Sequence, residues 1–204
     1  SGTGYQFTVD DATTPTVVFG GYSPAPNAID VSKTTNNVLT FTENVQAGTG
    51  NIVVTPSGGN MQADDVALNI PVGDSQVSFS ATAVTVNPTN DLVDHGGKRY
   101  TVTMSSGVIK DIQNNLYAGL FGTSYRFSVK DSTPPLVTVY SPLNNFGSAA
   151  KNTNIVLTFS EDVQAGAGNV VITPSNGNGP DTPVTIAVGQ FAISLTTVTI
   201  DPPS

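Results

Sequence analysis

Apolar and polar residues alternate along many short stretches of the chain, and this period of two predicts β-strands rather than helices. Turn-forming Gly, Pro, Asn and Asp residues separate these stretches. Between residues 11 and 130 the predicted strands are 16–22, 37–42, 51–55, 66–72, 83–86, 99–105 and 124–129. Seven short strands of this kind are typical of a sandwich of two sheets with Greek-key connections.

One sequence occurs twice in the chain. LTFTENVQAGTGNIVVTPS at 39–57 returns as LTFSEDVQAGAGNVVITPS at 157–175, an offset of 118 residues. Extending the comparison to 36–57 against 154–175 gives 16 identical positions of 22. Because this offset is the length of a small domain, the chain is predicted to contain two homologous units.

A second match relates the first residues of the chain to the end of the first unit. GTGYQFTVDD at 2–11 and GTSYRFSVKD at 122–131 are identical at six of ten positions. We therefore expect residues 1–10 to be the last strand of a preceding repeat plus a linker, and 11–130 to be one complete repeat. Residues 131–204 would then form a repeat that lacks its last two strands, in an excerpt of a longer protein.

Composition agrees with many strands joined by turns: the chain has 20 Gly, 14 Pro and no Trp. It has no Cys, which excludes a disulfide framework and a thiolate metal site. Packing, hydrogen bonds or a hard cation must therefore stabilise the fold.

The formal net charge is −8, from 15 acidic and 7 basic residues. This charge argues against nucleic acid and against an anionic membrane as partners, and it makes calcium the natural counter-ion to consider. No apolar run approaches the roughly 20 residues of a membrane helix, so we expect no membrane insertion.

Three motifs give the chain a family resemblance. They are Asp-x-x-x-Pro-x-Val at 11–17 and 131–137, Leu-Thr-Phe-Ser/Thr-Glu-x-Val at 39–45 and 157–163, and GVIKDIQNNLYAG at 107–119 followed by Tyr-x-Phe-x-Val. The chain resembles the bacterial Ig-like repeats of S-layer proteins and of large repetitive surface or adhesion proteins. The resemblance implies an all-β fold of tandem Ig-like β-sandwich repeats, the second one incomplete.

The same resemblance implies a structural spacer or stalk in an extracellular protein of the bacterial cell surface, with neighbouring repeats of the parent chain as partners. One alternative is a filament or surface-layer module that self-associates through strand exchange. Another is a glycan-binding adhesion module. Tyr5, Tyr100 and Tyr125 alternate with apolar neighbours and are predicted to pack in the core, which leaves Tyr22, Tyr117 and Tyr140 for sugars.

In such repeats the segment at Asp111 usually reads Asp-x-x-Gly-Asn, whereas Asn114 occupies the Gly position here. Asn tolerates the left-handed backbone conformation better than most residues, so we expect the turn to be kept.

A glutamate directly follows the strand at 37–42, at a position that alternation places on the same face as the core residues of that strand. Leu39 and Phe41 are the best core candidates of that strand, and Glu43 shares their face, as Glu161 shares the face of its counterparts. A carboxylate directed toward a core needs a partner, because burial of a bare charge is costly.

If the strands run in the directions usual for an Ig-like sandwich, the linker end of the complete unit contains Asp10, Asp11, Glu43 and Asp111. The matching place on the second unit then contains Asp131 and Glu161. Two interpretations stay open. These carboxylates could bind Ca²⁺, which prefers oxygen ligands. Alternatively, Glu43 accepts backbone N–H bonds from the adjoining loop, and Asp11 and Asp111 hold Asx turns.

Catalysis has little support in the sequence. The chain has one histidine, His95, in a Gly-rich turn, and no nucleophile elbow accompanies it. We therefore expect no enzyme. Asp64, Asp65, Asp91 and Asp94 are interpreted as solvated loop charges.

Overall fold

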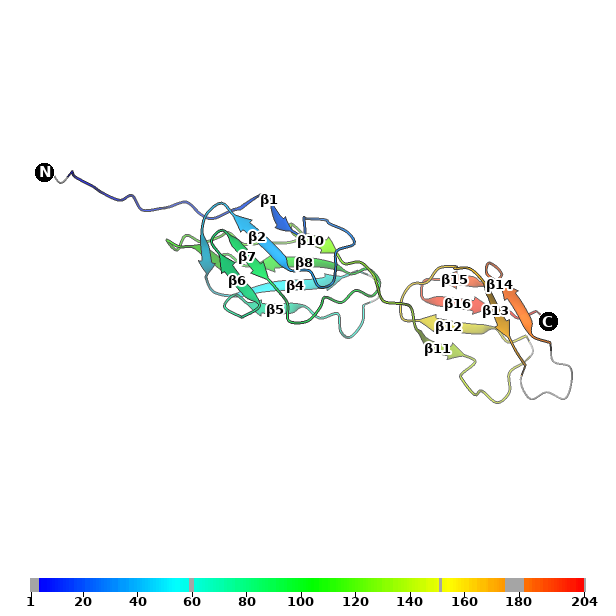
Figure 1. Ribbon diagram of the computed structural model, residues 1–204. Helices are drawn as coiled ribbons and strands as arrows, with labels where there is room; N and C mark the ends of the chain where they lie inside the picture. The colour runs from blue at the N-terminus through cyan, green and yellow to red at the C-terminus, as the bar shows by residue number, and fades with distance from the viewer. Residues whose placement is uncertain (1–3, 59–60, 151, 175–181, 204) are drawn as a thin grey trace. The chain divides into compact units, whose positions relative to one another are not determined.

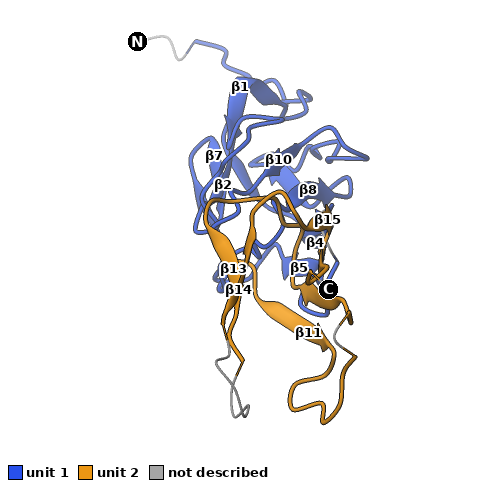
Figure 2. Cartoon of the chain, turned by 90° about the vertical axis from the view of Figure 1, so that its right-hand side faces the viewer, with its two compact units in different colours: residues 1–132 blue, residues 133–204 orange. Residues whose placement is uncertain are grey.

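A computed structural model describes residues 4–58, 61–150, 152–174 and 182–203 of the chain. The fold is all-β, as predicted, and the chain divides into two compact units, residues 1–132 and 133–204 (Figure 2). The described residues contain no helix of the length and hydropathy needed to cross a membrane.

Unit 1 is a sandwich of two four-stranded antiparallel sheets (Figure 1). The first sheet contains, in spatial order, β1 (Val17–Ser23), β2 (Asn37–Phe41), β7 (Ala83–Val86) and β6 (Val77–Ser80). The second contains β10 (Arg126–Ser128), β8 (Arg99–Met104), β4 (Asn51–Ser57) and β5 (Leu68–Pro71). A third pair consists of β3 (Val45–Ala47) and β9 (Ile109–Asp111). Neighbours in space are often distant in sequence, as Greek-key connections require.

The core of unit 1 lies between the two sheets and is made by alternate residues of each strand. Leu39 and Phe41 of β2 are 0% and 2% exposed, which confirms them as core residues. From the facing sheet, Val54, Tyr100 and Phe127 are buried in the same cluster.

Unit 2 repeats the first sheet of unit 1. Its four-stranded sheet has the spatial order β11 (Val137–Ser141), β12 (Ile155–Phe159), β16 (Thr197–Ile200) and β15 (Ala192–Ser194). In place of a second four-stranded sheet, the described part of unit 2 has one antiparallel pair, β13 (Asn169–Ile172) and β14 (Val184–Ala187). The core is correspondingly open, because Leu157 and Phe159 are only half-buried although their counterparts in unit 1 are buried.

Short strands account for most differences from the predicted pattern. The strands β3, β6 and β9 contain three or four residues each and were not predicted, because alternation over so few residues carries no clear period.

The prediction for Tyr5 was wrong. Its side chain is 92% exposed, since residues 4–9 form no strand with the described parts of the chain. Tyr100 and Tyr125 are buried as predicted, and Tyr117 is buried with them.

Gly48 is required for the close pairing that extends β3 and β9. A Cβ atom added at Gly48 would lie 2.0 Å from the Gly107 carbonyl oxygen, so these two backbones would have to separate. We expect Gly48→Ala to lower the free energy of unfolding by about 2 kcal/mol. Urea unfolding followed by circular dichroism measures this loss. Gly73→Ala is the matched control, because a Cβ there meets nothing within 4 Å; equal losses in both variants would contradict the explanation.

Candidate metal centre

The strand β2 ends at the end of unit 1 that the N-terminal segment reaches (Figure 1), and Glu43 is the second residue after its last residue, Phe41. Alternation places its side chain on the face of Leu39 and Phe41. The side chain is half-buried, and its Oε1 atom is buried with no hydrogen-bond partner. This carboxylate therefore has one buried oxygen that accepts no hydrogen bond.

Asp111 reaches the same place through the pairing of β3 with β9. Val45 is opposite Asp111 in this ladder, so the last residue of β9 lies beside the segment that follows Glu43. The Gln46 side chain reinforces the pairing by donating from Nε2 to the Asp111 carbonyl oxygen at 2.7 Å. Asp111 is fully buried as a result.

The turn after Asp111 fixes its carboxylate. Asn114 has a φ of 75°, which confirms the expected left-handed conformation at this position. Asn115 then donates from its backbone nitrogen to Asp111 Oδ1 at 2.7 Å and from Nδ2 to Oδ2 at 2.8 Å. Burial alone raises the pKa of Asp111, but the hydrogen bonds from Asn115 and from neighbouring backbone amides outweigh it and lower the pKa below 3.8. Asp111 is thus held as an anion.

Asp11 is brought to the site by the linker, the segment of residues 10–16. Its Oδ1 atom accepts a hydrogen bond from the Thr13 backbone at 2.8 Å, which forms a local turn. Asn115 Nδ2 donates to the Asp11 carbonyl oxygen at 2.9 Å. Asn115 therefore connects the linker to the Asp111 carboxylate.

Three of the predicted ligands come together here. Carboxylate oxygens of Asp11, Glu43 and Asp111 lie within 4.8 Å of one another. Burial raises the pKa of Glu43 above 4.5, and the charges of Asp11 and Asp111 raise it further. Oxygen atoms at this spacing, on side chains from three separate segments, fit the ligand set of a hard cation such as Ca²⁺.

The other three predicted ligands are outside this cluster, and two of them, Asp131 and Glu161, were predicted for the matching place on the second unit. Asp10 is exposed and does not belong to the cluster. Asp131 Oδ2 accepts a hydrogen bond from the Gly96 backbone at 3.0 Å, in unit 1. Glu161, beyond the end of β12 in unit 2, is only 4% exposed.

Local structure at the start of both units is nevertheless the same. In unit 1 the Thr42 amide donates to the Thr16 carbonyl at 2.9 Å, and Thr42 Oγ1 accepts from the Thr16 amide at 3.2 Å. In unit 2 the equivalent distances between Ser160 and Leu136 are 2.8 and 3.0 Å. The segment before each glutamate is thus fixed to the incoming strand in the same way.

Two residues interpreted as solvated loop charges are buried instead. Asp94 is 6% exposed and pairs with Lys33 at 3.3 Å, and the Asp65 side chain is fully buried against Lys98 at 2.8 Å. The sequence contained a signal for the pair of Asp65 and Lys98. Alternation places Lys98 on the same face of β8 as the buried Tyr100 and Val102. A cation on that face requires an anionic partner.

Comparison with known proteins identifies the family of the chain. No match was found among curated proteins or among solved structures. A family model described as bacterial Ig-like domain matches residues 11–129 and again residues 131–204. These two matches follow the two copies of the internal repeat, and the chain belongs to the bacterial Ig-like domain family.

Proposed function

We propose that the chain is a structural spacer of an extracellular bacterial surface or adhesion protein, and that calcium stiffens the joint at which the linker meets unit 1. Domains of this family commonly occur in bacterial surface proteins. The observation that carries the calcium part is the convergence of Asp11, Glu43 and Asp111, one from the linker and two from the sandwich.

The unused Glu43 oxygen favours a cation over a purely structural role. A glutamate that only accepted backbone N–H bonds would have a donor at each buried oxygen, whereas Oε1 of Glu43 has none. Three carboxylates this close repel one another, and the charges of Asp11 and Asp111 add to burial in raising the pKa of Glu43. A divalent cation removes the repulsion and supplies the missing partner.

A cation at this place would restrain the linker. The hydrogen bond from Asn115 to the Asp11 carbonyl oxygen attaches the linker to the sandwich. Binding of the Asp11 carboxylate to an ion shared with Glu43 and Asp111 adds a second, stronger attachment. The direction in which the preceding segment leaves the unit then becomes fixed, which is what an extended stalk requires.

A spin label in the segment that precedes the linker tests this proposal. The chain has no cysteine, so Thr8→Cys, an exposed position, gives a single site for a nitroxide label. We expect millimolar Ca²⁺ to broaden the electron paramagnetic resonance spectrum, and Glu43→Gln to abolish the change. A label at Asn90→Cys, in a loop at the other end of unit 1, should not respond. Identical Thr8 spectra with and without calcium would refute the stiffened joint.

Calcium binding at Glu43 predicts a dependence on pH. Because the folded-state pKa of Glu43 lies above 4.5, the metal-free unit takes up a proton as the pH falls through that pKa. The folded state then gains stability without calcium, while protons compete with the ion. We expect the stabilisation by Ca²⁺ to shrink between pH 7 and pH 4.5. Asp111 stays ionised over this range because its pKa is lowered. A calcium effect that is constant over this range would contradict the role of Glu43.

A second candidate function is self-association of the repeats. Tyr5, Phe7 and Val9 alternate with smaller or polar residues and are 92%, 73% and 82% exposed. Unit 2 has a cavity of about 310 Å³ lined by Leu157, Phe159 and other apolar residues of its open core. Residues 4–9 resemble residues 124–129, which include the edge strand β10 of unit 1, so a second copy offers a similar strand. Analytical ultracentrifugation across concentration tests this function, and a strictly monomeric chain excludes it.

A further inference from the structure

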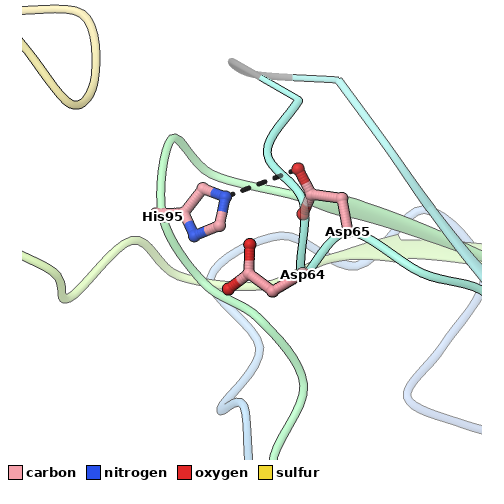
Figure 3. A group of neighbouring side chains, drawn as sticks. All are labelled: Asp64, Asp65 and His95. Atoms are coloured by element: carbon pink, nitrogen blue, oxygen red, sulfur yellow. Dashed lines mark hydrogen bonds and ion pairs between the residues drawn. The ribbon is translucent and has the colours of Figure 1, made fainter.

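A second group of side chains that could bind a metal lies in unit 1. Its loops are separate from those of the linker cluster, which consists of Asp11, Glu43 and Asp111. The second group consists of Asp64 and Asp65, from the loop between β4 and β5, and His95, from the loop between β7 and β8. Ligand atoms of the three residues lie within 4.8 Å of one another, and Figure 3 shows the side chains converging. Chemically the group differs from the linker cluster, because it contains an imidazole.

Asp65 is the best-fixed member of this group. Its Oδ2 atom accepts a hydrogen bond from the Gln62 backbone at 2.6 Å and pairs with Lys98 Nζ at 2.8 Å. Lys98 is itself fully buried and donates to the Gly58 carbonyl oxygen at 3.0 Å. His95 Nε2 lies 3.4 Å from the same Oδ2 atom. The carboxylate is therefore oriented before any ligand arrives.

The other oxygen of Asp65 points independently to a missing ligand. Asp65 Oδ1 is buried, has no hydrogen-bond partner, and belongs to a side chain that is 0% exposed. A buried anionic oxygen left without a partner is destabilising. The carboxylate of Asp65 thus has Oδ2 held by protein donors, with the imidazole 3.4 Å from it, while Oδ1 stays open, and a carboxylate supported in this way suits a metal ligand.

We propose that Asp64, Asp65 and His95 bind a first-row transition-metal dication such as Zn²⁺. One imidazole nitrogen and two carboxylate oxygens suit this class of ion, whereas Ca²⁺ takes oxygen ligands only. Lys98 does not block the site, because it pairs with Oδ2 and leaves Oδ1 open. Three protein ligands leave a fourth position of a tetrahedral ion for water.

Metal binding here would join the two loops at the end of unit 1 from which the chain leaves. The loop of His95 also holds Asp131, through the Gly96 backbone at 3.0 Å, and Asp94 accepts a hydrogen bond from Ser132. The ion would thus lock the loop that holds residues 131 and 132. This inference does not depend on the calcium proposal, because the two clusters share no residue.

Histidine resonances make the test specific. His95 is the only histidine of the chain, so the untagged protein labelled with ¹⁵N has a single imidazole spin system. We expect Zn²⁺ to shift these resonances with one-to-one stoichiometry and Ca²⁺ to leave them unchanged. Co²⁺ should give the visible absorption of a site with a nitrogen ligand.

Matched variants show which side chains carry the site. Asp64 is exposed, so Asp64→Asn should fold normally and bind Zn²⁺ at least tenfold more weakly in calorimetric titration. Asp91→Asn removes the same charge from an exposed residue of the His95 loop and should bind like the unmodified chain. Imidazole resonances that do not move in millimolar Zn²⁺, or unchanged affinity in Asp64→Asn, would overturn the proposal. Either result leaves the calcium proposal untouched.

Discussion

Glu43→Gln should have opposite effects with and without calcium. In a chelating buffer at neutral pH the variant is expected to melt at or above the temperature of the unmodified chain, because it removes one of three mutually repelling carboxylates. In calcium at 100 times the dissociation constant, the unmodified chain gains about 2.7 kcal/mol from ligand binding. For a unit of this size that is a rise of about 10 °C in Tm, which the variant should largely lose.

The competing interpretation makes the opposite prediction. If Glu43 fixed the adjoining loop as a hydrogen-bond acceptor, Glu43→Gln would destabilise unit 1 in the chelating buffer and calcium would change nothing. Asp30→Asn is the matched control. It removes an equal charge from an exposed residue whose φ of 54° suits Asn, and it should leave the calcium response intact.

Lys98→Met should be among the most destabilising single substitutions in unit 1. The change keeps the length of the side chain but leaves the fully buried Asp65 without its cation. Burial raises the pKa of Asp65, and the hydrogen bond and charge of Lys98, with the Gln62 amide, more than offset it. Without Lys98 the carboxylate is a buried, uncompensated anion, at a cost of about 3 kcal/mol. Urea unfolding at pH 7 measures the loss.

A double-mutant cycle separates the pair from the packing of the lysine stem. Adding Asp65→Asn to Lys98→Met removes the unpaired charge, so the double variant should recover part of the lost stability at pH 7. Below the raised pKa of Asp65 in Lys98→Met, the carboxyl is neutral and the single variant should recover as well. A loss of less than about 1 kcal/mol in Lys98→Met would instead indicate a solvated pair.

The linker cluster was largely predictable because its parts have local signatures. Strand parity placed Glu43 on the face of Leu39 and Phe41, and the residue type at Asn114 anticipated its left-handed turn. Polarity of an Ig-like sandwich then brought Asp111 to the same end. The role of Asn115 could not be predicted, since it depends on where the linker backbone passes.

The second cluster escaped prediction because its members meet only through tertiary structure. Asp65 and Lys98 are far apart in sequence, and short polar loops around Asp65 and His95 have no period from which burial can be inferred. The parity of Lys98 with Tyr100 indicated a buried cation but not its partner. Strands such as β9 were missed for a related reason, since three residues form a strand only when a distant partner pairs with them.

Calorimetric melting of the exhaustively chelated chain, with and without millimolar Ca²⁺, tests the central claim most directly. The transition of unit 1 can be assigned by its downward shift in Lys98→Met. The calcium joint predicts that this transition rises by about 10 °C when calcium reaches 100 times its dissociation constant. It also predicts that the rise disappears in Asp111→Asn. A unit 1 transition at the same temperature in chelator and in calcium would contradict the account and leave a metal-independent spacer.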